Sequence, residues 1–405
     1  MRELAEARKA VLSGVDTMDV GAVALSEARG RILAEDTVAE GPVPPFDNSA
    51  MDGYAVRGDD VKAAPTTLQV IGDVRAGHVA SSRVGRGEAI RIMTGAPLPE
   101  GSDTVVRVED TDGGAETVTI MVPVEAGRSV RRSGGDVAEG DVVLRKGTLL
   151  GPRHLGVLAT IGHARPLVYD RPKVAILSTG DEVRPPETPR LAPGEIRDAN
   201  RALISGLLGD LGIEPLDLGI VGDDRESLES SIHSGLESAD AMITSGGVSV
   251  GTHDLLKEVL ADLGEMELWR VAMKPAKPFA FGHIDSTPIF GLPGNPVSVF
   301  VAFEQFVRPA LLRMQGVTEV LRPRVIGVID EDVTSDPEKE VFLRVRTKWV
   351  DGLCHVRQSG GQESNMLAAT AAGDAFAVVP LGISSLKAGD PIEVEIFSWP
   401  HGRTP

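Results

Sequence analysis

Cysteine is almost absent from this sequence, since Cys354 is the only one among 405 residues. A single cysteine excludes an intrachain disulfide, a CxxC redox pair and a cysteine-rich zinc site. The eight histidines are scattered without the spacing of metal ligands, so we expect no zinc site. Such sparing use of cysteine favours a cytoplasmic location.

Long apolar runs are missing as well. No segment reaches the ~18 consecutive apolar residues that a membrane-spanning helix needs. The amino-terminal residues instead place Leu4, Ala7, Val11 and Leu12 at helical spacing with charges between them. This pattern predicts an amphipathic helix rather than a signal peptide, and we expect no membrane partner.

Basic residues are in the minority. The sequence has 41 lysines and arginines against 59 aspartates and glutamates, which gives a net charge of −18. A field of that sign repels phosphate backbones and anionic lipid, so we expect no nucleic acid as a partner either. An anionic small molecule is still allowed where basic groups, backbone N–H groups or metal ions gather locally.

The rest of the composition is that of a folded protein, with 42% hydrophobic and 25% charged residues. A chain of this length is expected to form two to four domains. We predict an α/β multidomain fold with a central αβα domain, an inserted mostly-β domain and a small carboxy-terminal β-barrel. The predicted domains are residues 1–45 with 141–170, a discontinuous amino-terminal and linker domain, then 46–140, 171–320 and 321–405.

Strands and helices alternate in the central segment, which predicts a mostly parallel sheet covered on both faces. Gly212 is a natural stop for one of the helices, and Asp223 or Asp224 opens the next. A long apolar helix is expected to follow the sequence PGNP. The other expected elements are strands at 173–177, 215–220 and 241–244, helices at 199–211 and 255–263, and a hairpin of 279–283 with 288–292.

Three loops in this segment follow predicted strands and are rich in glycine and small residues. In an open α/β sheet, ligands bind where strands end, and free N–H groups there suit a phosphate. None of the loops is a Walker A or GxGxxG motif, and each alone is equally well explained as a tight turn. The candidate ligand-binding residues are Ser178, Thr179, Gly180, Ser245, Gly246, Gly247, Ser249, Pro293, Gly294, Asn295 and Pro296.

Carboxylates recur beside these loops. Asp181 and Glu182 directly follow a strand, and Asp254 follows the second loop. Hard oxygen ligands beside a phosphate site suggest Mg²⁺ held jointly by protein and substrate, with these three residues as candidate ligands. Asp223 and Asp224 are better explained as helix N-caps, and Asp254 suits either role equally.

Two lysines stand three residues apart in Met273-Lys-Pro-Ala-Lys-Pro278. Its prolines predict extended, stiff backbone, and the apolar residues on both sides predict partial burial of Lys274 and Lys277. Preset cations of this kind bind oxyanions, although a solvated charge pair is the simpler alternative. The inserted segment adds Asp52 in FDNSAMDGY and Asp136 in RRSGGD, where turn formation alone is also a sufficient explanation.

Six motifs occur in one order along the chain: FDNSAMDGYAV, RIMTGAPLPEGSDTVV, STGDEV, TSGGVSVGTHD, MKPAKPFAFG and GLPGNPVS. In this order they resemble the molybdopterin molybdenumtransferase (molybdenum insertase) family of MoeA type, which is related to the gephyrin E domain. The resemblance covers nearly the whole chain. It implies an elongated homodimer with four domains per subunit and a central domain like the molybdopterin adenylyltransferases. The implied reaction inserts molybdate into adenylylated molybdopterin, with Mg²⁺-dependent release of AMP.

The resemblance also implies which positions matter, and these are Asp52, Thr94, Asp136, Glu182, Asp254, Lys274, Lys277, Pro293 and Pro296. Among them we expect Asp52, Glu182, Asp254, Lys274 and Lys277 to be catalytic. The chain departs from the family where Ala276 replaces a usual glycine, and we expect the backbone to approach a ligand less closely there. In GGQESNML, Glu363 and Asn365 replace the glycine and histidine of a GQGSHML-like segment, which weakens any role for Ser364 or its neighbours and leaves open whether this region acts at the site.

Two other functions stay compatible with the same residues. The central domain could itself adenylylate molybdopterin with ATP, or the chain could serve as a dimeric scaffold for cofactor assembly. Expected transient partners are a molybdopterin adenylyltransferase and the molybdoenzyme apo-proteins or their chaperones. Molybdate and tungstate are not distinguished, because both are tetrahedral dianions of similar size.

Overall fold

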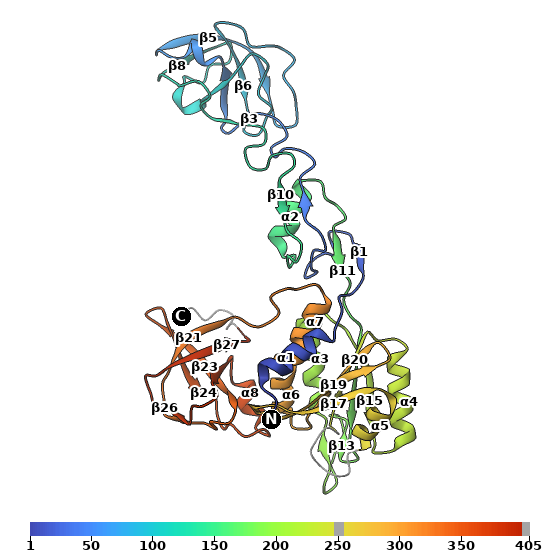
Figure 1. Ribbon diagram of the computed structural model, residues 1–405. Coiled ribbons are helices and arrows are strands. Elements are labelled where there is room, and N and C mark those ends of the chain that lie inside the picture. The colour runs from blue at the N-terminus through green and yellow to red at the C-terminus, as the bar shows by residue number, and fades with distance from the viewer. Residues whose placement is uncertain (247–254, 399–405) are drawn as a thin grey trace. The chain divides into compact units, whose positions relative to one another are not determined.

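A computed structural model describes residues 1–246 and 255–398 of the chain (Figure 1). The chain divides into two compact units, and each is described by itself. The larger unit comprises Met1–Gly21, Gly30–Ile32 and Tyr169–Pro405, and the smaller unit comprises Ala22–Arg29 and Leu33–Val168. β1 (Val20–Ala22) and β11 (Leu167–Tyr169) lie where the chain passes from one unit to the other. The predicted domain boundaries stay predictions.

A six-stranded sheet forms the centre of the larger unit. Its first four strands are parallel to one another, and the fifth strand runs antiparallel to both of its neighbours. This arrangement confirms the predicted mostly parallel sheet, and the antiparallel pairing of residues 278–284 with 287–292 confirms the predicted hairpin. In spatial order the strands are β15 (Pro215–Val221), β12 (Val174–Thr179), β16 (Ala241–Ser245), β20 (Thr287–Leu292), β19 (Pro278–Ile284) and β17 (Glu265–Arg270).

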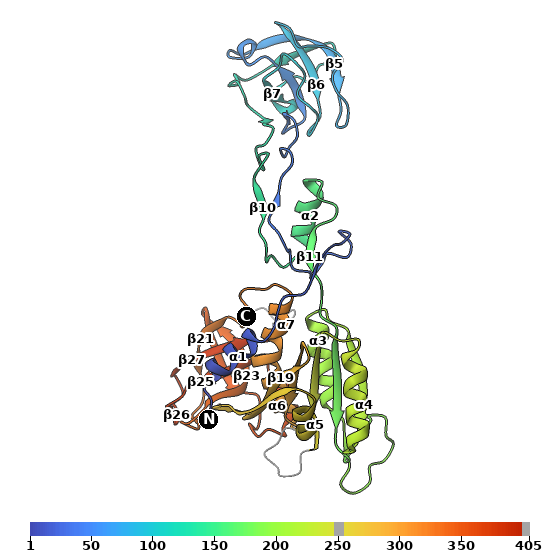
Figure 2. The ribbon, with the colours of Figure 1, turned by 45° about the vertical axis from the view of Figure 1, so that its right-hand side comes forward.

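Helices cover both faces of this sheet, as the alternating pattern predicts (Figures 1 and 2). α4 (Arg225–Leu236) and α5 (Leu255–Leu263) bury their leucines against one face. The other face packs against five helical elements, which come from the amino terminus, the middle and the end of this segment of the chain. These are α1 (Leu4–Ser13), α3 (Asn200–Asp210), α6 (Pro296–Ala302), a π-helical turn (Phe303–Val307) and α7 (Arg308–Met314).

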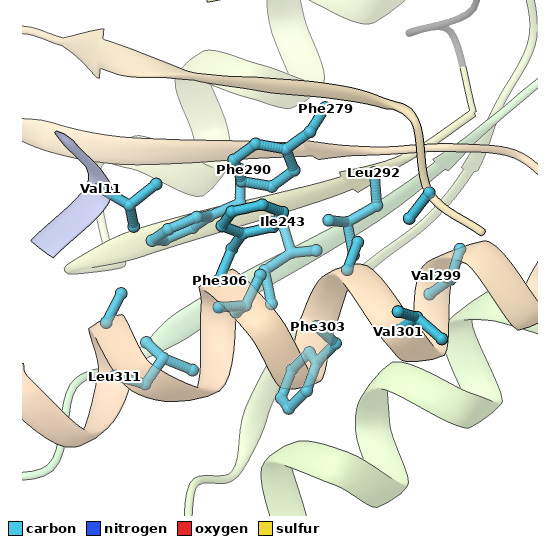
Figure 3. Packing of buried hydrophobic residues seen from close by; sticks show 14 of the residues in the cluster. Val11, Ile243, Phe279, Phe290, Leu292, Val299, Val301, Phe303, Phe306 and Leu311 are labelled. Atoms are coloured by element: carbon cyan, nitrogen blue, oxygen red, sulfur yellow. The ribbon is translucent and has the colours of Figure 1, made fainter. Parts of the chain in front are cut away.

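The largest core lies between this sheet face and the helix that follows Asn295 (Figure 3). The rings of Phe279 on β19 and Phe306 in the π-helical turn stack with their centroids 4.2 Å apart. Val11 of α1 reaches the same cluster. Since each fully buried aromatic or aliphatic side chain stabilises the fold by about 1.5–3 kcal/mol, this core is a main source of stability for the larger unit.

Five strands close into a small barrel at the carboxy-terminal end, which confirms the predicted β-barrel. They follow the order β23 (Glu340–Val350), β24 (Leu353–Gln358), β21 (Arg324–Ile329), β27 (Pro391–Ile396) and β25 (Ala375–Val379), which pairs again with β23. β18 (Met273–Lys274) also pairs with β23, so the lysine segment is attached to the barrel. Smaller elements are β13 (Val183–Arg184) with β14 (Ile196–Arg197), β22 (Val333–Thr334) with β26 (Ser385–Leu386), and α8 (Leu367–Ala371).

The smaller unit is mostly β, as predicted for the inserted segment. Two short strands, β2 (Thr37–Val38) and β10 (Val142–Leu144), pair before and after its main sheet, as an insertion requires. The main sheet runs β7 (Thr104–Arg107), β4 (Gly53–Val56), β6 (Glu88–Ile92), β5 (Thr66–Val74) and β8 (Thr117–Ile120). The remaining elements are β3 (Asn48–Ser49) with β9 (Val130–Arg131), α2 (Pro152–Thr160), and two 3₁₀ turns, Gly58–Asp60 and Val108–Asp110.

Candidate functional site

The three predicted ligand loops begin at one edge of the central sheet. They follow β12, β16 and β20, which are parallel neighbours, so their carboxyl ends lie together. Gly246 donates its N–H to the carbonyl of Leu292 at 3.2 Å, with φ of +94°. A Cβ at this position would lie 2.8 Å from the carbonyl oxygen of Thr179. Only glycine fits such a close approach between strand ends.

Hydroxyl groups at this edge are buried and have no partner among the residues that the structure describes. The side-chain oxygens of Ser178, Thr244 and Ser245 accept and donate no hydrogen bond to any described residue. All three residues are buried. Since buried polar atoms are nearly always hydrogen-bonded, these hydroxyls indicate a polar binding surface. Gly247, Ser249 and Asp254, which belong to the same predicted site, lie outside the described residues.

The predicted metal ligands stand at the end of β12. Asp181 and Glu182 are both exposed, and Asp181 Oδ1 accepts the N–H of Asp223 at 3.0 Å. Asp224 caps α4 by accepting the N–H of Ser227 at 2.8 Å, and hydrogen bonds from Ser227 lower the pKa of this carboxyl. The N-cap interpretation is therefore confirmed for Asp224, whereas Asp223 supports Asp181 through its backbone.

A cleft of about 640 Å³ opens beside the lysine segment. Four stretches that are distant in sequence line it, so sequence proximity could not predict this cleft. It contains Lys274 and Lys277, and also Lys339, which pairs with Asp336. The lining residues are Met273, Lys274, Pro275, Ala276, Lys277, Pro278, Pro293, Gly294, Asn295, Ser298, Lys339, Gln362, Glu363, Ser364 and Asn365.

The lysine segment differs from its prediction in two respects. Lys274 and Lys277 are exposed rather than partly buried, and the backbone is bent rather than extended. Ala276 has φ of +67°, its side chain is buried, and Val271 donates its N–H to the carbonyl of Lys277 at 2.8 Å. This tight loop turns the apolar neighbours inward, and both ammonium groups therefore face the cleft and solvent.

The carboxy-terminal stretch of the cleft was not assigned a role from sequence, yet it is well anchored. Asn295 donates from its side-chain amide to the hydroxyl of Ser364 at 2.9 Å. Gln362 bonds both to the N–H of Arg344, at 2.9 Å, and to its carbonyl, at 3.1 Å. The guanidinium of Arg344 is fully buried and donates to the carbonyl of Gly361 at 2.7 Å. Burial lowers the pKa of Arg344. Its bond to Gly361 anchors this loop beside the cleft.

Sequence analysis did not identify these residues, because their sequence neighbours do not indicate a role at the site. Arg344 lies within a strand that also carries Arg346 and Lys348, and nothing in the sequence distinguishes it from a surface arginine. Lys339 stands in a turn between charged residues, where a solvated side chain is the usual explanation. The resemblance of GGQESNML to a family segment was the one signal available for Gln362 and Ser364.

The smaller unit brings together two of its three predicted residues. Asp52 Oδ1 accepts the N–H of Thr94 at 2.6 Å and its hydroxyl at 2.7 Å. These bonds, the backbone one first, lower the pKa of Asp52. Asp136 is exposed and contacts neither of them, but its loop is tied down because Arg132 donates to Asp47 at 2.6 Å. Asp52 is thereby preorganised as a carboxylate.

Known proteins match the chain along nearly its whole length. Family models match residues 2–162 (MoeA N-terminal region, domain I and II), 175–313 (probable molybdopterin binding domain) and 327–397 (MoeA C-terminal region, domain IV). The molybdopterin molybdenumtransferase of Haemophilus influenzae is 38% identical over 386 residues, covering 92% of this chain and 93% of that protein. The chain belongs to the molybdopterin molybdenumtransferase family.

Further relatives agree with this assignment. Molybdopterin molybdenumtransferase 2 of Mycobacterium tuberculosis is 36% identical, covering 97% of this chain and 99% of that protein. The crystal structure of a molybdopterin biosynthesis MoeA protein from Pyrococcus horikoshii is similar with a TM-score of 0.83 and 33% identity, covering 98% of this chain and 99% of the other. The family resemblance of the six motifs is thus confirmed.

Family membership clarifies the origin of the cleft. Its lysine and Asn295 segments belong to the part matched as a probable molybdopterin binding domain, and Gln362 to Asn365 belong to the MoeA C-terminal region. The cleft therefore lies between two family domains that the pairing of β18 with β23 holds together.

The described residues offer two carboxylates for a metal ion rather than a complete site. Among residues 1–246 and 255–398, no group of three or more His, Cys, Asp or Glu side chains is arranged to hold a metal. Asp181 and Glu182 nevertheless fit the chemistry of Mg²⁺, which binds to one or two carboxylates and completes its shell with water and substrate phosphates.

Across residues 1–246 and 255–398, no helix has the length and apolar character needed to cross a membrane.

Proposed function

We propose that this family member inserts molybdenum, supplied as molybdate, into molybdopterin during molybdenum cofactor biosynthesis. The observation that carries the proposal is the cleft with Lys274, Lys277 and Lys339, in a chain whose net charge is −18. Molybdate is a tetrahedral dianion, and converging ammonium groups are suited to hold its oxygens. The domain that contributes Lys274 and Lys277 to the cleft matches the model of a probable molybdopterin binding domain, which supports the second substrate.

The strand-end residues and the cleft lysines suit different parts of the substrates. The strand ends, with the buried hydroxyls of Ser178 and Ser245 that have no partner among the described residues, suit the phosphate of the pterin. The lysines suit the oxyanion. No protein nucleophile is required, because the sulfurs that take up molybdenum belong to the pterin. Cys354 fits this view, since it is buried in the barrel and burial raises the pKa of its thiol.

We further infer that the pterin arrives adenylylated and that AMP is released. Asp181 and Glu182, together with Asp254, would hold Mg²⁺, which supplies charge neutralisation at the phosphate. Glu182 is the better placed of the first two, because Asp181 already accepts the N–H of Asp223. The side chain of Glu182 makes no hydrogen bond or ion pair with the described residues, so both of its oxygens are available.

Reconstitution tests this function. The purified protein is incubated anaerobically with adenylylated molybdopterin, Mg²⁺ and molybdate, and AMP and molybdenum-loaded cofactor are measured. We expect both products to depend on molybdate. Consumption of ATP and molybdopterin without molybdate would instead identify an adenylyltransferase. Failure to bind either molybdate or pterin by a folded dimer would favour a scaffold.

We also propose that the enzyme is a cytoplasmic homodimer with a composite site. This is supported by the division of candidates between Asp52, Thr94 and Asp136 in the smaller unit and the remainder in the larger unit. An isologous dimer would contain two equivalent sites. Transient partners are a molybdopterin adenylyltransferase as supplier and apo-molybdoenzymes or their chaperones as recipients.

Subunit mixing tests the composite site. Asp52→Asn and Lys274→Ala subunits, each inactive alone, should form heterodimers in which one site carries both changes and the other carries none. We expect recovery of up to about half of the wild-type activity per heterodimer. If mass spectrometry shows heterodimers and activity does not recover, each site is built within one chain.

A further inference from the structure

One outer face of the barrel carries an unusual set of side chains. β23 and β24 form an antiparallel hairpin in which Arg346 pairs with Arg357, Lys348 with His355, and Val350 with Leu353. On the next strand, Gly327 pairs with Cys354, so the preceding residue, Ile326, lies beside Leu353. We call this surface the hairpin face, and its members are Ile326, Arg346, Lys348, Val350, Leu353, His355 and Arg357.

The hairpin face has an exposed aliphatic row. Ile326 is 66% exposed, Leu353 is 54% exposed and Val350 is 38% exposed. The alternate residues of the same strands, such as Cys354 and Val356, are buried in the barrel. The barrel core is therefore complete without the aliphatic row, and adjacent exposed aliphatic side chains of this kind mark a surface that another molecule covers.

Two rows of basic residues stand beside the aliphatic row. Arg346, Lys348 and Arg357 are exposed, and none forms an ion pair with a described residue. Arg346 donates only to the carbonyl of Ala372, at 2.8 Å. His355 is the exception, since its Nδ1 lies 2.8 Å from Asp330 Oδ1. Like charges directly opposite each other in a sheet destabilise it, so the pairing of Arg346 with Arg357 does not itself stabilise the fold, and Arg346 contributes only through its bond to Ala372 and its attraction to Asp374.

Another arginine on the barrel shows the ordinary arrangement. Arg324 on β21 pairs with Glu340, Glu393 and Glu395, with nitrogen to oxygen distances of 2.7 to 3.0 Å. A chain with 59 acidic residues has ample partners for its basic groups. The unpaired cations of the hairpin face are therefore a local reversal of the charge of the whole molecule.

We propose that the hairpin face binds a second protein that presents carboxylates around an apolar side chain. Protein interfaces combine an apolar centre with a polar rim in which arginine is enriched, and the hairpin face has this composition. The net charge of −18 disfavours a uniformly anionic partner such as nucleic acid or a lipid surface. This binding role goes beyond the proposed insertion of molybdenum and does not rest on it.

A synthetic peptide with glutamates flanking two leucines tests the proposal, with the full chain as receptor and fluorescence anisotropy as the measurement. We expect binding at low salt that weakens as salt rises. Arg346→Glu with Arg357→Glu should weaken binding by about tenfold or more. Leu353→Ser should reduce it to the affinity of an all-glutamate peptide. The matched control, Arg153→Glu with Arg190→Glu, makes the same charge change at exposed positions elsewhere.

Arg346→Glu alone separates binding from folding. It places an acidic side chain opposite Arg357, so the melting temperature should rise slightly while peptide binding falls. The proposal is overturned if the peptide does not bind at low salt, or if the control pair weakens it equally. It is also overturned if phosphatidylserine vesicles bind more tightly than the peptide, or if light scattering shows that the hairpin variants change the oligomeric state.

Discussion

The strand ends and the lysine cleft lie in the same unit, but in the proposed function they would bind anions by different means. At the strand ends, the hydroxyls of Ser178 and Ser245 are buried, and the N–H of Gly246 is bonded to the carbonyl of Leu292. In the cleft, the ammonium groups of Lys274 and Lys277 are exposed on a tight loop. The first region depends on close backbone packing and the second on charge, so the two should fail in different ways when mutated.

The largest expected effect is the loss of a cleft lysine. Lys274→Ala and Lys277→Ala should each lower turnover by about 10²–10³, or roughly 3–4 kcal/mol, because each removes a preorganised donor to the oxyanion. Both side chains are exposed, so thermal unfolding should not change. Lys257→Ala on α5 is the control, since it removes an exposed lysine away from the cleft. Wild-type turnover in the cleft variants would remove these lysines from the site.

A methyl group at the strand ends should act through packing instead. Gly246→Ala would place Cβ 2.8 Å from the carbonyl oxygen of Thr179 at a φ of +94°. We expect a loss of about 1–3 kcal/mol in the free energy of unfolding, with weaker pterin binding. Gly206→Ala in α3 is a matched control, because nothing lies within 4 Å of a Cβ there. Equal stability of the two variants would contradict the tight contact.

Removing the charge of Glu182 should change only the Mg²⁺ dependence of AMP release. Glu182→Gln keeps the shape of the side chain but weakens it as a ligand for Mg²⁺, so half-maximal release of AMP should require roughly tenfold more Mg²⁺. A titration of AMP release against Mg²⁺ measures this shift, and Glu187→Gln in the same region serves as the control. An unchanged titration would exclude Glu182 as a ligand.

The smallest effect is expected at Ala276 and should have the opposite sign. A left-handed conformation costs a non-glycine residue about 1–2 kcal/mol, whereas glycine loses about 0.5–1 kcal/mol of chain entropy on folding. Ala276→Gly should therefore stabilise the protein by about 0.5–1 kcal/mol in denaturant titrations, while activity stays close to that of the wild type. Lower stability in the variant would show that packing of the buried methyl group outweighs the strain.

Local features of the chain explain why much of the fold could be predicted. The continuous apolar run ending at Leu177 becomes the buried strand β12, and the helix before Gly212 ends where predicted. Gly212 has φ of +69°, and Ile213 donates its N–H to the carbonyl of Leu208 at 2.9 Å. These outcomes depend on neighbours in sequence, on side-chain period and on the conformational freedom of glycine.

The conformation of the lysine segment could not be predicted from its neighbours in the sequence. Its prolines and apolar flanks predicted extended and partly buried backbone, but pairing of Lys274 with Val341 of the barrel and the bond from Val271 to Lys277 bend it. The π-helical turn that places Phe306 against Phe279 was also unforeseen. Both depend on contacts with distant strands, and no local pattern encodes them.

The sequence by itself determined the alternation of strands and helices, the glycine-rich strand ends and the family to which the chain belongs, because these are carried by short ordered motifs. Only the tertiary structure decided that Gln362 and Ser364 share a cleft with Lys274, and that Arg346 faces Arg357 on a closed barrel. The physical reason is that closure of the barrel on β23 fixes which distant side chains meet, and many long-range contacts set that closure together.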